Sequence, residues 1–448
     1  MSSINTVMNK FIGVSPSAER FAVRVPTWAL LVLGVSLIAV SGGHSGVAAL
    51  AWVAPVPWLL LMGRTERWWE RALLGLALAG AMTLQLSTIV SEPVPFIFAP
   101  MFGVPIAAGL WLIYMVWDVV RRRLSARFAL YALPASAAVL DVFWLTIGPT
   151  GAWGTASVSQ ADNLVLLQLA SVFGVAGVGF VMAWVASFLA VVAVDSRPRR
   201  WLADGLLLAV ALVTIAGFGT WRLAQSSSGQ TVSVAAVVTD VGLSAKGLPT
   251  PEELADNVDV LFARSALAAD RGARLVVWNE GATAVSSEEA PALVRRGQEF
   301  ARDRGVDLVL AFIVVTSESP LAFKNRAVFI DDSGAVLTTY HKRHPVPGET
   351  EPSDNPVPRL DRPYAVVSLA ICYDEDFPEM SLAHAALGAE LVAVPSSDWA
   401  GIDPVHTKMA RVRAIEGGFS MLRATRWAAS AGYDSMGRVR GWMRVDEA

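Results

Sequence analysis

The chain has 448 residues, of which 54% are hydrophobic and 17% are charged, whereas ordinary soluble domains have about 45–50% and about 25%. The net charge of -3 gives no electrostatic reason to expect nucleic acid as a partner. A single cysteine excludes a disulfide framework and a cysteine-rich metal site. Long apolar stretches fill the chain up to about residue 225, and a more charged part follows. We therefore expect a membrane protein with a globular half.

Seven apolar stretches of the first half are each long enough to cross a bilayer, which takes about 20 helical residues. They lie near residues 23–41, 46–63, 72–91, 96–118, 128–147, 164–194 and 202–221. They are almost free of internal charge, which is costly inside a bilayer. The pattern predicts an α-helical membrane domain of about seven spans rather than the buried helices of a soluble protein. No small-residue cleavage site follows the first stretch, so it is not a cleavable signal peptide.

The loops between these stretches alternate in charge. The loops near 42–45, 92–95 and 148–163 contain no lysine or arginine. The other loops carry Arg64, Arg67, Arg71, Arg121, Arg122, Arg123, Arg127, Arg197, Arg199 and Arg200. By the positive-inside rule the arginine loops are cytoplasmic. Seven spans then place everything after Trp221 on the outer face, which in a bacterium is the periplasm.

Two segments near the end of the membrane part differ in composition from the spans. The outer loop 148–162, GPTGAWGTASVSQAD, is either an ordinary connector or a segment that packs under the next domain or guides a lipid to it. Residues 225–230, QSSSGQ, predict a short flexible link. We therefore expect a transmembrane domain over 1–225 and a second domain over 226–448.

The second half alternates between strand and helix patterns. Strands are expected within 231–240, 274–281, 306–315, 364–374 and 389–399, and two more within 325–342 around an Asp-Ser-Gly turn. Helices are expected within 251–273, 288–304 and 378–388. This alternation predicts a layered α/β domain. Functional residues of such domains usually follow the carboxyl ends of strands.

Glu280, Lys342 and Cys372 each follow the end of an expected strand. A thiol needs a base to become a nucleophile, and a carboxylate can supply that base. A lysine can stabilise the oxyanion that forms when the thiol attacks a carbonyl. The alternative is that Glu280 and Lys342 are solvated loop residues and that Cys372 is a small buried apolar side chain. The acidic residues after Cys372 would oppose thiolate formation, so Lys342 has to compensate.

The segments WNEG, YHKRHPVPGE and ICYDEDFPE, in this order, resemble the Glu-Lys-Cys pattern of the nitrilase (carbon–nitrogen hydrolase) superfamily. With ALAWVAPVPWLLL and SQADNLVLLQLASVFGVAGVGF in the membrane half, most of the chain resembles the apolipoprotein N-acyltransferase family. The resemblance implies a nitrilase-like αββα sandwich. It also implies that Glu280 is the general base, that Lys342 stabilises the oxyanion and that Cys372 is the nucleophile.

The same resemblance implies three further site residues. Glu349 falls where the family has a second, supporting glutamate, and Asp374 falls where it usually has a supporting glutamate. Trp399 matches an aromatic residue of a mobile loop beside the site, a substrate-binding position. The chain ends at GWMRVDEA, before the further strand and closing transmembrane helix of that family.

The reaction implied by the resemblance moves a fatty acyl chain from a phospholipid to the N-terminal amine of a lipoprotein through a Cys372 thioester. It needs no cofactor, and the enzyme would be a monomer in the bacterial inner membrane with its catalytic domain in the periplasm. His341 and His344 lack partners at metal-binding spacing, so we predict no metal site. Two alternatives stay open, a membrane-tethered amidase that hydrolyses a small substrate and a catalytically inactive membrane scaffold.

Overall fold

The computed structural model describes residues 25–44, 46–195, 197–225, 229–243, 247–346, 349–350 and 353–444. The chain forms two compact units. Unit 1 comprises Met1–Ser87, Ile97–Val142 and Ala176–Gly217, and unit 2 comprises Thr88–Phe96, Phe143–Val175 and Phe218–Ala448. Unit 2 thus combines the C-terminal half with two segments of the N-terminal half. Residues 226–228 of the expected link and the last four residues of GWMRVDEA lie outside the described residues, and the domain boundary at 225/226 stays a prediction.

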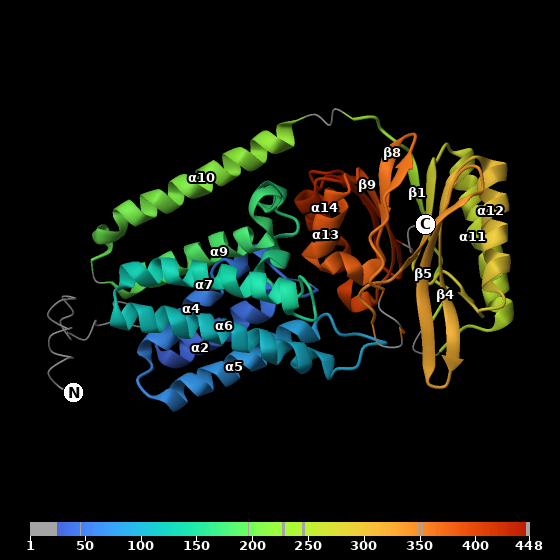
Figure 1. Cartoon of the computed structure of the whole chain (residues 1–448). Coiled ribbons are helices and arrows are strands. Elements are labelled where there is room, and N and C mark those ends of the chain that lie inside the picture. Colours follow the sequence, from blue (N-terminus) through green and yellow to red (C-terminus); the bar gives the residue numbers. More distant parts are fainter. Residues whose placement is uncertain are drawn as a thin grey trace. The chain divides into compact units, whose positions relative to one another are not determined.

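Unit 1 is built from helices, several of which continue into unit 2 (Figure 1). The helices of the N-terminal half are α2 (Thr27–Ser41), α3 (Ala48–Ala51), α4 (Pro55–Arg64), α5 (Trp68–Ser87), α6 (Phe98–Arg123), α7 (Ala126–Ile147), α8 (Leu164–Leu167), α9 (Ala170–Val194) and α10 (Leu202–Ala224). Two 3-10 helices accompany them, η1 (Ala156–Gln160) and η2 (Pro198–Trp201).

The prediction of seven spans is not confirmed. Among the described residues, four helices are long and apolar enough to cross a membrane: Phe98–Arg123, Ala126–Ile147, Ala170–Val194 and Pro198–Ala224. The first expected span forms only α2, whose 15 residues reach about 22 Å, less than the bilayer core of about 30 Å. A turn separates α3 from α4 within the second expected span. Helix α5 has 20 residues but carries Glu70 in its first turn.

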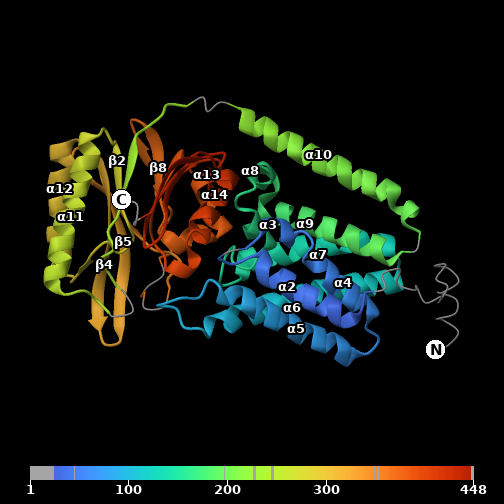
Figure 2. The same ribbon diagram turned by 180° about the vertical axis from the view of Figure 1, so that it is seen from behind.

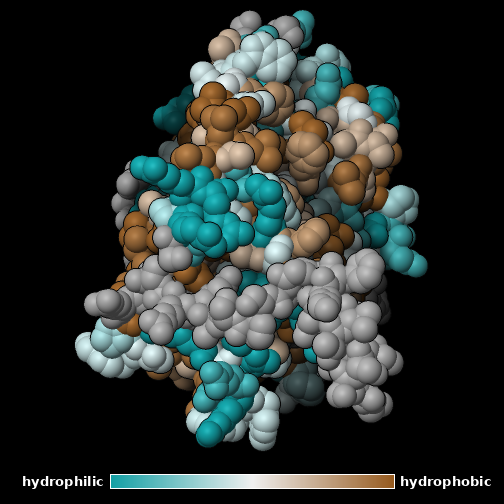
Figure 3. All heavy atoms as spheres, turned by 90° about the vertical axis from the view of Figure 1, so that its left-hand side faces the viewer, coloured by the Kyte–Doolittle hydropathy of each residue, from teal (hydrophilic) through white to brown (hydrophobic). Residues whose placement is uncertain are grey.

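The arginine loops meet at one end of unit 1. Arg122 donates to the carbonyl of Thr65 at 2.7 Å and pairs with buried Asp118 at 2.8 Å, and Arg127 pairs with Asp204 at 3.0 Å. These contacts join the end of α4 to the end of α6, and the beginning of α7 to the beginning of α10. Figure 3 views this end, where hydrophilic atoms (teal) gather beside hydrophobic surface (brown). Arginine-rich segments that are far apart in the sequence therefore lie close together in unit 1.

Unit 2 contains two six-stranded sheets. The first has the order β1-β2-β4-β5-β6, with β3 paired to β4, and the second has the order β12-β11-β10-β9-β8-β7. The first comprises β1 (Val234–Val237), β2 (Leu275–Trp278), β3 (Ala284–Val285), β4 (Asp307–Glu318), β5 (Leu321–Ile330) and β6 (Val336–His341). The second comprises β7 (Leu360–Arg362), β8 (Ala365–Leu369), β9 (Leu391–Ser397), β10 (Ser420–Arg426), β11 (Ser430–Tyr433) and β12 (Val439–Met443).

The two sheets face each other and carry helices on their outer sides (Figures 1 and 2). Helices α11 (Pro251–Asp270) and α12 (Ala290–Arg304) cover the first sheet, and α13 (Pro378–Ala386) and α14 (Val405–Gly417) cover the second. One buried hydrophobic cluster contains Val277 and Phe312 of the first sheet together with Val367 and Ala393 of the second. The expected alternation of strands and helices is therefore confirmed, in an αββα arrangement with the core between the sheets.

The parallel strands bring several polar residues to one edge of the sandwich. Strands β1, β2 and β4 are parallel to one another, as are β8, β9 and β10. Glu280 follows β2, and Cys372 follows β8. The backbone N–H of Glu280 donates to the carbonyl of Ser396 at 3.2 Å, so the carboxyl ends of the two sheets are fastened directly to each other.

Two segments of the N-terminal half pack on the sandwich within unit 2. The N–H of Ala152 donates to the carbonyl of Asp376 at 2.8 Å. A Cβ atom on Gly151, which has φ +54°, would lie 2.4 Å from that carbonyl, so this approach requires glycine. Of the two alternatives for loop 148–162, the structure supports packing against the following domain. Loops 92–95 and 148–163, predicted to be on the outer side, belong to the same unit as the sandwich.

The orientation is tested with a reporter enzyme that is active only outside the cytoplasm. A fusion after Gln230 should be active, and a fusion after Leu124, between α6 and α7, should be inactive because arginine-rich loops stay in the cytoplasm. Western blots check that both fusions are present at similar amounts. Activity in the Leu124 fusion alone would reverse the proposed topology.

Candidate active site

Lys342 lies in a buried cluster of charges at the end of β6. Its Nζ atom is 2.8 Å from Oε1 of Glu280 and 3.0 Å from Oε1 of Glu349. Asn325 of β5 donates to the same two oxygens, at 2.7 and 2.8 Å. Only 4% of the lysine side chain is exposed. A buried ammonium group requires such partners, so the two carboxylates hold Lys342 in one position.

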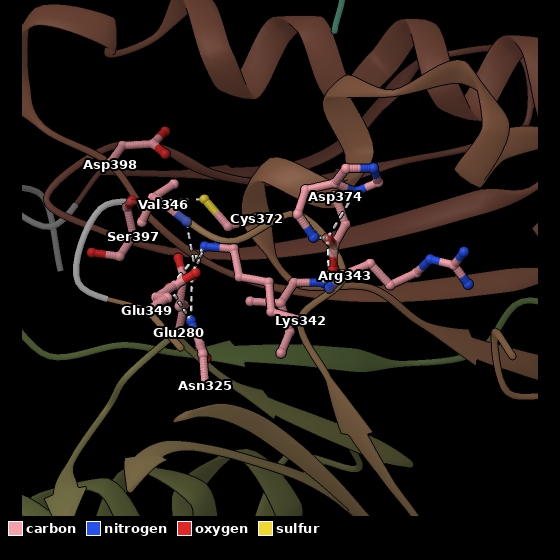
Figure 4. Close-up of polar contacts among 12 residues, drawn as sticks. Glu280, Asn325, Lys342, Arg343, Val346, Glu349, Cys372, Asp374, Ser397 and Asp398 are labelled. Atoms are coloured by element: carbon pink, nitrogen blue, oxygen red, sulfur yellow. Dashed lines mark hydrogen bonds and ion pairs between the residues drawn. The ribbon is translucent and has the colours of Figure 1, made fainter. Parts of the chain in front are cut away.

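Cys372 faces this cluster from the second sheet. Figure 4 shows its sulfur beside the Lys342 ammonium group and the two glutamate carboxylates. Cys372 is buried, its φ is +48°, and its Sγ atom lies 3.7 Å from the carbonyl oxygen of Ser397. A positive φ is strained in a residue with a Cβ atom, and such strain occurs often at functional sites. The thiol is thus held on a sharp turn between β8 and the 3-10 helix η3 (Cys372–Asp376).

The environment of Lys342 favours its charged form. Burial lowers the pKa of Lys342, but the carboxylates of Glu280 and Glu349 outweigh burial and raise it well above its ordinary value. Burial and the Glu280 charge also raise the pKa of Glu349 against the effect of Lys342. The lysine is therefore a permanent positive charge beside the thiol at neutral pH.

The environment of Cys372 favours the protonated thiol. Burial raises its pKa, the Glu280 carboxylate raises it further, and the Lys342 charge opposes both, with a net shift well above the ordinary value. The sequence suggested that the acidic residues directly after Cys372 would oppose ionisation. The carboxylates that oppose it most are Glu280 and Asp398. The resting site therefore holds a neutral thiol beside the Glu280 carboxylate.

Asp374 joins the Cys372 turn to the loop that follows Lys342. Its Oδ2 atom accepts from the Tyr340 hydroxyl at 2.8 Å and from the N–H of Ile371 at 3.0 Å. Its Oδ1 atom accepts from the N–H groups of Arg343 and His344, at 3.1 and 2.8 Å. The Nδ1 atom of His344 also lies 3.2 Å from Oδ1. The supporting role of Asp374 in the reaction stays a prediction.

Trp399 lies at the start of a short segment after β9. Its side chain is half-buried, and the indole N–H donates to the carbonyl of Ile89 at 2.7 Å. In the same segment, the N–H of Gly401 donates to the hydroxyl of Ser91 at 2.9 Å. The structure thus places Trp399 against the segment 88–96. A substrate-binding role for it stays a prediction.

Several polar residues of the site were not predicted from the sequence. Asn325 donates to both glutamates. In the sequence, only its polar side chain within an expected strand could have indicated such a role. His406, Asp398 and Arg423 form a buried charged group close to Cys372. A pocket reaches Lys342 and Glu349 and is lined by Lys324, Asn325, His341, Lys342, Pro345, Glu349 and Thr350. The pocket thus borders the charged cluster on the side of Lys342 and Glu349.

Cys372, Asp398 and His406 also offer three metal-ligand atoms within 4.8 Å of one another. The ring nitrogens of His406 already face carboxylate oxygens, at 2.8 Å from Asp398 and 3.0 Å from Asp376. Arg423 binds both oxygens of Asp398. Donor atoms engaged in this way suit an ion-pair network better than a metal site, which needs free lone pairs.

The state of the thiol can be measured by its alkylation. Because the pKa of Cys372 is raised, the rate constant for reaction with iodoacetamide should increase with pH from about 6 to about 9 without a plateau, since the thiolate is the reactive form. The same chain unfolded in urea provides the control, with a thiol that titrates near about 8.5. A plateau below about pH 8 in the folded protein would contradict a neutral resting thiol.

Two known protein families match this chain, one in its N-terminal half and one in its C-terminal half. Residues 29–188 match the model of the apolipoprotein N-acyltransferase N-terminal domain. Residues 234–441 match the model of the carbon-nitrogen hydrolase family. The two matches follow each other along the chain, so the C-terminal α/β half is a nitrilase-like domain.

Similar proteins align over most of the chain. The apolipoprotein N-acyltransferase of Geobacter metallireducens is 25% identical, over 92% of this chain and 86% of its own length. The apolipoprotein N-acyltransferase of Gloeobacter violaceus is 27% identical, over 91% of this chain and 86% of its own length. Human deaminated glutathione amidase is 38% identical over 105 residues, which are 20% of this chain and 32% of the amidase. With both domain matches in tandem, the chain belongs to the apolipoprotein N-acyltransferase family of the nitrilase superfamily.

Proposed function

We propose that the protein is a membrane acyltransferase that moves a fatty acyl chain from a phospholipid to the N-terminal amine of a lipoprotein. Cys372 is the nucleophile, Glu280 is the general base and Lys342 stabilises the oxyanion. Glu349 and Asn325 position the lysine, and no cofactor takes part because side chains supply the nucleophile, the base and the positive charge. The proposed location is a bacterial inner membrane, with the sandwich on the periplasmic side.

In the first half of the reaction, Glu280 accepts the proton of the Cys372 thiol as the sulfur attacks the ester carbonyl of the phospholipid. The carbonyl oxygen becomes an oxyanion beside the charged Lys342, which is already in place and needs no reorganisation. The ester C–O bond then breaks. The proton on Glu280 passes to the departing alkoxide, which leaves as a lysophospholipid, and the acyl chain stays on Cys372 as a thioester.

In the second half, the amine of the lipid-modified N-terminal cysteine of a lipoprotein attacks the thioester carbonyl. Lys342 again faces the oxyanion, and Glu280 accepts a proton from the amine. The C–S bond breaks, the sulfur regains the proton, and an amide is formed. The same base and cation serve both halves, as required when two acyl transfers follow one another at one nucleophile.

The observation that carries this proposal is the buried pairing of Lys342 with two glutamates beside the chain's one cysteine. It supports acyl transfer through sulfur, and the match of the N-terminal half to the acyltransferase domain supports a lipid substrate. An inactive scaffold would have no need to keep a strained cysteine and an intact buried ion cluster.

The second candidate is a membrane-tethered amidase. The local similarity of 38% to an amidase favours it, although that similarity covers only 20% of the chain. The chemistry is the same up to the acyl-enzyme, and water replaces the amine in the second half. The two candidates therefore differ only in the acceptor.

The proposal is tested by acyl transfer from phospholipid vesicles to a diacylglyceryl-cysteine peptide with a free amine. Wild-type protein should form the amide. Cys372→Ala should abolish transfer, and Glu280→Gln and Lys342→Met should each lower the rate by about 10²-fold or more, the usual cost of losing a base or an oxyanion donor.

An N-acetylated copy of the peptide is the control and should accept no acyl chain. Circular dichroism checks that each variant keeps its fold. Transfer by Cys372→Ala at the wild-type rate would reject the mechanism. Ammonia release from small amides, without any transfer to the peptide, would instead support the amidase.

A further inference from the structure

A second charged cluster lies buried behind the nucleophile. His406 is held between two carboxylates, with Nε2 at 3.0 Å from Asp376 and Nδ1 at 2.8 Å from Asp398. Arg423 contacts both oxygens of Asp398, at 2.9 and 3.0 Å, and its Nη2 atom lies 2.8 Å from Nδ1 of His406. All four side chains are buried, so each charge depends on the others for its stability.

This cluster reaches the reactive sulfur. The Sγ atom of Cys372, a carboxylate oxygen of Asp398 and a ring nitrogen of His406 all lie within 4.8 Å of one another. A carboxylate so close to sulfur opposes the formation of a thiolate, and it does raise the pKa of Cys372. The positive groups beside Asp398 therefore decide how strongly its charge acts on the nucleophile.

His406 is charged in this environment. Burial lowers the pKa of His406 and Arg423 also opposes its charge, but the carboxylates of Asp376 and Asp398 outweigh both and raise the pKa to about 9. From the outer loop, the indole N–H of Trp153 donates to the other oxygen of Asp376 at 2.8 Å, and its ring lies 5.6 Å from the His406 ring. The negative charges of Asp376 and Asp398 and the positive charges of His406 and Arg423 therefore sum to zero.

We propose that His406 is a positioning residue for the reaction, which keeps the charge beside Cys372 balanced so that the thiolate can form when the acyl donor is attacked. The inference rests on the proposed role of Cys372 as the nucleophile. Without His406, Asp376 and Asp398 would outweigh Arg423 by one negative charge. At about 5 Å and an effective dielectric constant of about 20, one such charge changes an ionisation equilibrium by roughly a few hundredfold.

The test is the rate of Cys372 alkylation by iodoacetamide in the full chain in detergent, which requires no lipid substrate. His406→Gln should lower the rate constant at about pH 7.5 by at least about tenfold, because it leaves the uncompensated charge. The pH profile should move to higher pH. A wild-type rate and profile in this variant would overturn the proposal.

The double variant Asp376→Asn/His406→Gln separates charge from packing. It removes one negative and one positive group together, so its alkylation rate should return to within about threefold of wild type if charge balance is the cause. A loss that persists in the double variant would overturn the proposal in favour of packing. If His406→Gln alone does not fold, the double variant is compared directly with wild type. An alkylation rate within about threefold of wild type then supports charge balance, and a larger loss overturns it.

His384→Gln is the matched control. His384 is also buried and pairs with Glu375 at 2.9 Å, but it does not belong to the three-atom group around Sγ. Its substitution should leave the alkylation rate within about twofold of wild type, because the lost contact with Glu375 is not beside the sulfur. An equal loss in both histidine variants would show a general effect of disturbing the core and would overturn the specific role of His406. A failure of acyl transfer to any peptide would reject the proposed function without changing these alkylation rates.

Discussion

The site depends on one constraint, which is that the buried ammonium group of Lys342 must be neutralised. Glu280 and Glu349 meet this constraint with carboxylate oxygens 2.8 and 3.0 Å from Nζ. Asn325 donates to the same two oxygens at 2.7 and 2.8 Å and so helps to hold them in place. Breaking such a buried pair by removing one partner costs about 3–5 kcal/mol. The charges are therefore fixed before substrate binds. Cys372 approaches from the second sheet, so the packing of one sheet on the other determines the distance between nucleophile and cation.

The second sheet is held in turn by segments from the N-terminal half within the same unit. Helix α14 carries His406 at its first turn, and Arg411 one turn further on donates to the carbonyl of Ala161 at 2.9 Å. At its end, Glu416 accepts from the N–H of Val175 at 2.9 Å. One helix thus connects the surroundings of the nucleophile with loop 148–162 and with the kink at Gly174 in α9. The unit that holds the proposed catalytic residues therefore includes two segments of the N-terminal half.

Local sequence patterns predicted much of unit 2. Helix α11 lies within the helix expected over 251–273 and begins at a capping box of Thr250 and Glu253. Strands β2 and β8 end just before Glu280 and Cys372, as expected. The buried positions of Asn325 and His406 could not be predicted, because a polar residue in an alternating pattern looks solvated until distant segments cover it. The count of seven spans was not confirmed because hydropathy does not show where turns interrupt an apolar stretch, as between α3 and α4.

The central claim is that Cys372 carries the acyl chain between donor and acceptor. It is tested most directly by incubating the purified protein with phospholipid vesicles and no amine, followed by digestion and mass spectrometry. The account predicts that the peptide containing Cys372 gains the mass of one fatty acyl chain, which hydroxylamine removes as it would a thioester. An unmodified Cys372 peptide, or a stable acyl group on another residue, would contradict it.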